Sequence, residues 1–216
     1  MSIDNLIDDL TSEGVKKPLP KPFIQTLYWF VPTFILIAMA TYFMGIRHDM
    51  HDKMYQGFYL LELISLAVTI LVCTFTAFSY SRPDLYQKSW MIWVTLAILP
   101  TPFIFGCLGA SEFLSMVSFE ESLHNHMGQK CATCVTLFAI PSVIALFTML
   151  RLGTSPHPGV TGFLAAIAST LLSYTVLRVN EANDNPAHII VWHVFPVVMI
   201  AAIGFVAGYF ILRWKK

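Results

Sequence analysis

The run from Phe58 to Tyr80 reads FYLLELISLAVTILVCTFTAFSY and contains a single charged residue, Glu62. An α-helix rises about 1.5 Å per residue, so a run of this length crosses a hydrocarbon core of about 30 Å. Five more apolar runs of this kind lie along the chain, at Phe23–Ile46, Ser89–Gly109, Cys131–Leu152, Val160–Leu177 and His188–Leu212. We therefore predict an all-α integral membrane bundle of six transmembrane helices.

The composition agrees with a chain that lies mostly in a membrane. Of 216 residues, 56% are hydrophobic and 12% are charged, with a formal net charge of zero, whereas an average soluble domain has about 25% charged residues. The six runs leave only short connections, so we predict a cytoplasmic leader of residues 1–22 and a transmembrane domain of residues 23–216. Without a basic run, nothing favours direct binding of nucleic acid.

The distribution of Lys and Arg predicts the orientation, because cytoplasmic flanks of membrane helices are enriched in positive charge. Nine of the 13 Lys and Arg residues lie on the side that both termini share, and the other four are Arg47, Lys53, Lys130 and Arg178. We therefore expect a multi-pass protein with both termini in the cytoplasm. The loops 47–57, 110–130 and 178–187 are then outside.

The leader has the pattern of a short amphipathic helix. Apolar residues occur at i, i+3, i+4 and i+7, and acidic residues occupy the other face. A helix this short is marginal in water and needs a surface, and an acidic face favours a basic protein partner over an anionic membrane. The alternative is that it packs on the protein's own cytoplasmic loops or has no fixed structure. The candidate partner-binding residues are Ile3, Leu6, Ile7, Asp8, Asp9 and Leu10.

Side chains that bind soft metals gather on the predicted outer side. His48 and His51 lie in the first outer loop, and His124, His126 and Met127 in the second. Imidazole and thioether groups suit copper or zinc, and the lack of an oxygen cage argues against calcium or magnesium. These five are therefore possible metal ligands; the alternative is that the histidines are polar loop residues at the membrane interface.

Cys131 and Cys134 are three residues apart at the start of a predicted helix, so their sulfur atoms share one side. Such a pair can bind a metal ion, or form a disulfide in an oxidising compartment. Alternatively, both cysteines pack as small apolar side chains. We consider them candidate signal-sensing residues.

Two ionisable residues lie inside predicted spans, where they are energetically expensive and usually face the interior of the bundle. Glu62 is about one turn inside the second run, and could pair with His193 or Arg47 or extend to the interface. His193 lies at a similar depth in the last run, and could equally serve as a structural hydrogen-bond donor.

Taken together, residues along nearly the whole chain resemble the NrsF family, the negative regulators of sigma F. The order and spacing of the matching positions carry the resemblance. They are LIDDL at 6–10, GIRHDM at 45–50, Phe58, Glu62, Cys131, PGVTG at 158–162, Asp184, Trp192, His193, Gly204, Gly208 and LRW at 212–214.

The resemblance implies a six-span anti-sigma factor of the bacterial inner membrane, without enzymatic activity. Its leader would hold an extracytoplasmic-function sigma factor until an outside signal, often heavy-metal or oxidative stress, releases it. Two outer cysteines are associated with that signal in the family, and Cys131 resembles the first. The second would precede the last span, where residues 178–184 contain no cysteine, so either Cys134 replaces it or the signal differs.

Two other functions compete with this interpretation. A membrane thiol oxidoreductase using Cys131 and Cys134 would need a second cysteine pair or a quinone site to pass electrons on. A small transporter of soft metals would need ligands along a path through the membrane, whereas these gather at one face. We expect no resident cofactor, and at most a sensed copper, zinc or other soft metal ion.

Overall fold

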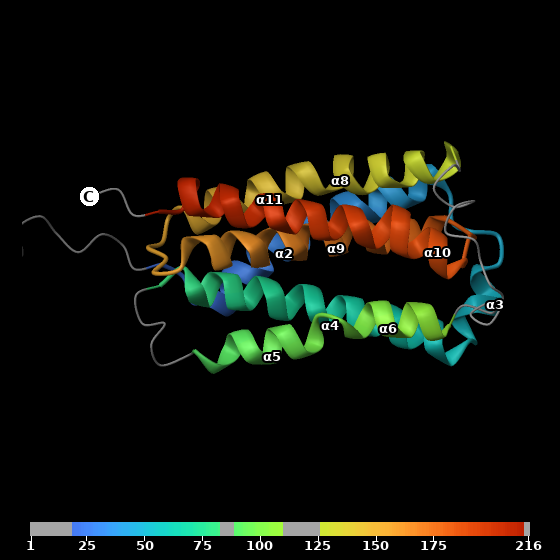
Figure 1. Ribbon diagram of the computed structural model, residues 1–216, viewed down its shortest axis with the longest axis horizontal. Coiled ribbons are helices and arrows are strands. Elements are labelled where there is room, and N and C mark those ends of the chain that lie inside the picture. The colour runs from blue at the N-terminus through green and yellow to red at the C-terminus, as the bar shows by residue number, and fades with distance from the viewer. Residues whose placement is uncertain (1–18, 83–88, 110–125, 214–216) are drawn as a thin grey trace, which may run out of the picture.

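The computed structural model describes residues 19–82, 89–109 and 126–213, and these residues form helices and turns without any strand (Figure 1). Six helices among them are long and apolar enough to cross a membrane, which confirms the predicted all-helical bundle and indicates a multi-pass membrane protein. Their elements are α2 (Pro22–Met44), α4 (Gly57–Tyr80), α5 (Trp90–Ile98) with α6 (Thr101–Leu108), α8 (His126–Leu150), α9 (Pro158–Asn180), and α10 (Pro186–His188) with η2 (Ile189–Val194) and α11 (Phe195–Ile211).

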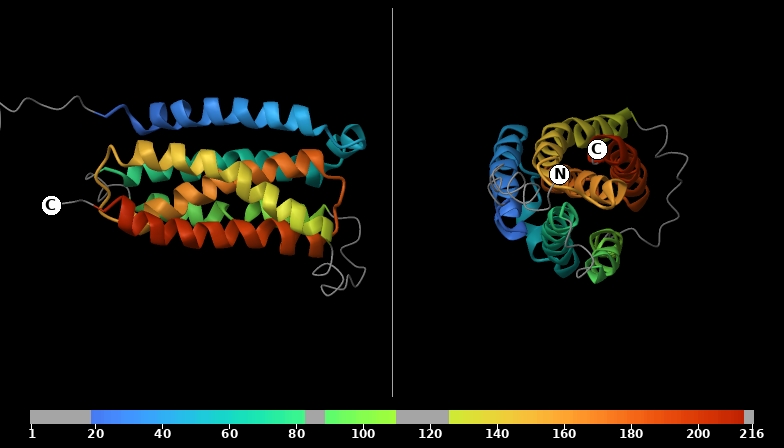
Figure 2. Two further views of the ribbon diagram at one scale, coloured as in Figure 1. Left: turned by 90° about the horizontal axis from the view of Figure 1, so that it is seen from above. Right: turned by 90° about the vertical axis from the view of Figure 1, so that its left-hand side faces the viewer.

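Helix α9 forms the centre of the bundle. Its most apolar stretch is 83% buried, against 22–39% in the other five spans, and it packs against α11, α4, α8 and α2. Helices α5 and α6 pack on α4 and lie at the periphery, as the end-on view in Figure 2 shows. The outer helices expose large apolar side chains such as Phe34, Trp93 and Phe205, which suits a hydrocarbon environment.

Glycines allow α9 and α11 to approach closely. A Cβ atom on Gly162 would lie 2.6 Å from the Cα of Gly208 and would also collide with the carbonyl oxygen of Gly204. Small residues spaced by four permit this kind of backbone contact between membrane helices. The G-x-x-x-G pattern of the last span is therefore used within the chain, against α9.

Three helix boundaries differ from the prediction. The third span is interrupted between α5 and α6 at Leu99 and Pro100, because Pro100 and Pro102 lack the backbone N–H that an uninterrupted helix would use there. Helix α8 begins at His126, within the predicted loop 110–130. Helix α9 continues to Asn180, so Arg178 lies in its last turn and not in a loop.

The connection after α2 is attached to the end of α9. Helix α2 ends at Gly45, whose φ of +87° is accessible to glycine at little cost. The side-chain amide of Asn180 donates to the carbonyl oxygens of Gly45 (2.6 Å) and Thr41 (3.3 Å), and the backbone N–H of Arg47 donates to Val179. The short helix α3 (Met50–Met54) follows. We call this end of the bundle, with residues 45–56 and 178–188, the α3 end.

Candidate functional site

A buried ion pair joins α4 to α9 at the α3 end. The Glu62 side chain is 1% exposed and that of Arg178 is 3% exposed. Arg178 donates from Nε to Oε1 of Glu62 at 2.7 Å and from Nη2 to Oε2 at 2.8 Å, and the hydroxyl of Tyr174 donates to Oε1 at 2.8 Å. Glu62 thus faces inward, but its partner is neither His193 nor Arg47, because the longer α9 places Arg178 opposite it.

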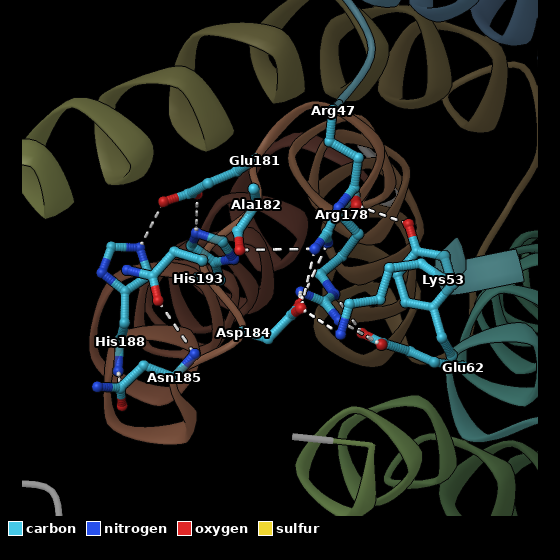
Figure 3. A network of polar contacts seen from close by, with 12 residues as sticks. Arg47, Lys53, Glu62, Arg178, Glu181, Ala182, Asp184, Asn185, His188 and His193 are labelled. Carbon is cyan, nitrogen blue, oxygen red and sulfur yellow. Dashed lines mark hydrogen bonds and ion pairs between the residues drawn. The ribbon is translucent and has the colours of Figure 1, made fainter. Parts of the chain in front are cut away.

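Asp184 extends this pair into a larger network (Figure 3). Its carboxylate accepts from Arg178 Nη1 at 2.9 Å and from Arg47 Nη2 at 2.9 Å, and lies 2.7 Å from Lys53 Nζ. Arg47 also donates to both oxygens of Asp49, at 2.6 and 2.8 Å. We call Arg47, Asp49, Lys53, Glu62, Arg178 and Asp184 the arginine cluster. It joins α3, α4, α9 and the 181–185 connection.

Tyr59 supports the arginine cluster from α4. The guanidinium carbons of Arg47 and Arg178 lie 5.6 and 5.4 Å from the centre of its ring, within the range of cation–π attraction. Its hydroxyl donates to the backbone oxygen of Arg178 at 2.8 Å. One aromatic ring therefore holds both arginines beside their carboxylates.

The charges of the arginine cluster balance, three cationic groups against three carboxylates. Burial alone would raise the pKa of Asp184, but the hydrogen bonds and charges of Arg47, Lys53 and Arg178 hold it well below its ordinary value. Burial would likewise lower the pKa of Arg47, and its bonds to Asp49 and Asp184 raise it instead. Asp184 and Arg47 therefore stay ionised because their partners compensate their desolvation.

A second group of side chains lies on the other side of the same connection. Glu181 Oε1 is 2.9 Å from His188 Nε2, and Oε2 is 3.0 Å from His193 Nε2 and accepts from Cys131 Sγ at 3.2 Å. One ligand atom from each of the four residues lies within 4.8 Å of the others. We call Cys131, Glu181, His188 and His193 the His–Cys cluster. Burial would raise the pKa of Glu181, but the two imidazoles lower it.

A π-helical turn places both histidines on one face. Residues five apart on an α-helix are rotated by about 140° from each other, which would direct His188 and His193 apart. In η2 the N–H of Phe195 instead bonds the carbonyl oxygen of Ile190, five residues earlier. Pro196 follows and lacks an N–H, which disfavours the regular α-helical pattern in this turn. Such turns are rare and often occur at functional sites.

The two clusters touch through Tyr174 and share one connection. The ring of His193 packs edge-on against Tyr174 at 5.7 Å, and the hydroxyl of Tyr174 bonds Glu62. Glu181 and Asp184, three residues apart, belong to different clusters. A movement of residues 181–185 therefore changes both.

The structure brings together only part of the predicted ligand set. Cys131 and His193 belong to the His–Cys cluster, whereas His48 and His51 are exposed and outside it. In the described part of the chain no disulfide links Cys131 to Cys134, which packs against the apolar core. His124 lies outside the described residues, as do the side chains of His126 and Met127 and the leader residues Ile3, Leu6, Ile7, Asp8, Asp9 and Leu10, whose roles stay predictions.

Sequence reasoning did not identify Glu181 and His188 as members of this cluster, Arg178 as the partner of Glu62, or Asp184 as the carboxylate that links Arg178 to Arg47. The five-residue spacing of the two histidines conceals their shared face unless Pro196 is taken as the cause of a wider turn. Glu181 is 50 positions from Cys131, and no local pattern connects them.

One comparison with known proteins assigns the chain to a family. The family model described as negative regulator of sigma F matches residues 13–214, which include both clusters. Searches of the curated proteins and of the solved structures found no match. Because the family model covers nearly the whole chain, the chain belongs to the NrsF family, the negative regulators of sigma F.

Proposed function

We propose that this protein is a non-enzymatic, membrane-bound anti-sigma factor that holds an extracytoplasmic-function sigma factor through residues 1–13 and releases it on a metal or redox signal outside the cell. The family match over residues 13–214 carries the proposal, since that family regulates a sigma factor negatively. The amphipathic pattern of residues 3–10, which precede the matched region, supports the leader as the binding segment.

The position of residues 19–21, which directly precede α2, supports a signal that crosses the membrane. They lie at the end of the bundle opposite the α3 end (Figure 2). There Arg82, just after α4, donates to the backbone oxygen of Pro20 and lies 3.3 Å from Gln25 Oε1. Arg82, Arg151 and Arg213 belong to this end, so the positive-inside rule favours it as the cytoplasmic one. Both polar clusters then face outward.

The release step requires a signal that binds the holding and releasing states with different affinity. The His–Cys cluster offers the chemistry for such a signal, because thiol and imidazole groups react with soft metals and a thiol with oxidants. Changing the contacts of Glu181 moves the connection that also carries Asp184. The arginine cluster would then pass the change to α4 and α9.

The test is co-purification of the full-length protein with each extracytoplasmic-function sigma factor of the same organism, together with a reporter of sigma-dependent transcription. Leu6→Asp or Leu10→Asp should abolish capture and raise the reporter, since each puts a charge on the apolar face. Asn5→Asp adds the same charge to the polar face and is the matched control, expected to retain both. If deletion of residues 1–13 leaves capture and transcription unchanged, the proposal is wrong.

A further inference from the structure

We propose that the His–Cys cluster is a binding site for a divalent zinc ion, with Cys131, Glu181, His188 and His193 as its four ligands. This site is a property of the folded chain and does not depend on the anti-sigma function. The donors are one sulfur, one carboxylate oxygen and two imidazole nitrogens, drawn from α8, the 181–185 connection, α10 and η2.

The spacing of the donor atoms fits a tetrahedral ion. At Zn–N and Zn–O bonds of about 2.0–2.1 Å and a Zn–S bond of about 2.3 Å, neighbouring ligand atoms are about 3.3–3.6 Å apart. Glu181 Oε2 lies 3.0 Å from His193 Nε2 and 3.2 Å from Cys131 Sγ, and its other oxygen, Oε1, lies 2.9 Å from His188 Nε2. With one ligand atom from each residue, no pair of ligand atoms is more than 4.8 Å apart. Shifts of a few tenths of an ångström to about 1 Å would centre an ion.

His188 faces Glu181 from a buried position. Its Nε2 lies 2.9 Å from Glu181 Oε1, and its Nδ1 has no hydrogen bond among the described residues. A neutral imidazole has one protonated and one unprotonated ring nitrogen. With the proton on Nδ1, the lone pair of Nε2 is available to an ion held beside Glu181.

The charges of the four ligands favour a dication. A Cys131 thiolate and a Glu181 carboxylate with two neutral imidazoles carry a charge of −2, so a divalent ion makes the site neutral. Without an ion, the Cys131 thiol keeps its proton and donates a hydrogen bond to Glu181 Oε2. Binding then replaces the S–H bond by a Zn–S bond and releases one proton to water, so affinity should rise about tenfold per pH unit where one proton is lost.

The donor set favours zinc over calcium and magnesium. Calcium and magnesium require six or more oxygen ligands, including water, and this cluster offers one protein carboxylate. Two imidazoles, a thiolate and a carboxylate form the closed four-coordinate set that Zn²⁺ prefers. Glu181 is partly exposed next to the end of the bundle, which provides a route of entry from water.

The test is metal binding by the full-length protein, purified in detergent with a chelator and then freed of it. Titration with Zn²⁺ against a fluorescent chelator should give one site per chain. Co²⁺ should give the absorption of a tetrahedral site with a sulfur-to-cobalt charge-transfer band. Cys131→Ser should remove that band, and it or His193→Ala should lower Zn²⁺ affinity about 100-fold or more, since even losing an outer partner of a ligand commonly costs 10–100-fold.

Cys134→Ser and His51→Ala are the matched controls, because they remove the same donor types near the same end of the bundle. Both should leave stoichiometry and affinity unchanged. Gel filtration and helical circular dichroism identify any variant that fails to fold, and Glu181→Gln then serves as a second ligand variant. The proposal is overturned if no stoichiometric site exists, or if the control variants weaken binding as much as the ligand variants do.

Discussion

The substitution Glu62→Gln tests the buried ion pair directly. It keeps the size of the side chain but removes the negative charge that accepts from Arg178 at 2.7 and 2.8 Å. The arginine cluster then carries one uncompensated positive charge, of which Asp184 neutralises only a part. Breaking one partner of a buried pair typically costs about 3–5 kcal/mol, and because Arg178 retains Asp184 we expect about 3 kcal/mol of lost unfolding free energy.

The double variant Glu62→Leu with Arg178→Met separates charge imbalance from loss of packing. Each single change leaves a buried charge, whereas the double change removes one charge of each sign and restores neutrality. Replacing a buried pair by apolar residues is often neutral in stability. We therefore expect the double variant to recover at least about 2 kcal/mol relative to the sum of the singles.

Unfolding in mixed detergent micelles, followed by circular dichroism, measures these differences. Asp49→Asn is the control from the edge of the same cluster. Its side chain is 28% exposed and Arg47 keeps Asp184 as a partner, so we expect a loss of about 1 kcal/mol or less. The reasoning is refuted if Glu62→Gln costs no more than Asp49→Asn, or if the two single effects simply add in the double variant.

Three further predictions concern other features of the bundle. Gly162→Val should destabilise the α9–α11 contact by about 2 kcal/mol or more, whereas Gly57→Ala, whose added Cβ meets open space, should change unfolding by less than about 0.5 kcal/mol. The pKa values of Glu181 and Asp184 are lowered from ordinary values of 4.5 and 3.8. The two carboxylates should therefore contribute their full share to the free energy of unfolding above pH 4.5, and less as the pH falls below it. Acid unfolding should show this loss of stability, and Asp184→Asn should make the dependence on pH less steep. Pro196→Ala restores an N–H and favours a regular helix, so zinc titration should show at least about tenfold weaker binding, and unchanged affinity would argue against the role of η2.

Hydropathy was sufficient to predict the six spans, because a run such as 58–80 has few alternatives to crossing a membrane. Hydropathy could not predict the residue at which a helix ends when its last turn is polar. Helix α9 extends three residues beyond Leu177, and that extra turn places Arg178 against Glu62. The capping of α2 by Asn180 is equally invisible in hydropathy.

The sequence was sufficient to predict the kind of ligand in the candidate site, but not which residues come together to form it. Cys131 and His193 are conspicuous because soft or ionisable groups are unusual in apolar helices. Their partnership depends on packing between α8 and the last span, and on a π-helical turn that one proline favours without dictating. The exposed His48 and His51 had equal ligand chemistry, and only the fold separates them from the cluster.

The contacts of α4 make it the element best placed to join the two ends of the bundle. At the α3 end, Glu62 holds α4 to Arg178 of α9; just beyond its other end, Arg82 contacts Pro20 at the base of the leader. A change in the arginine cluster that moves α4 against α9 therefore also changes the contact between Arg82 and Pro20. If zinc weakens the hold on a sigma factor through this route, linkage requires the bound sigma factor to weaken zinc binding by the same factor. Coupling is demonstrated when that factor, measured in both directions, differs clearly from one, and it is refuted when zinc and the sigma factor leave each other's affinity unchanged.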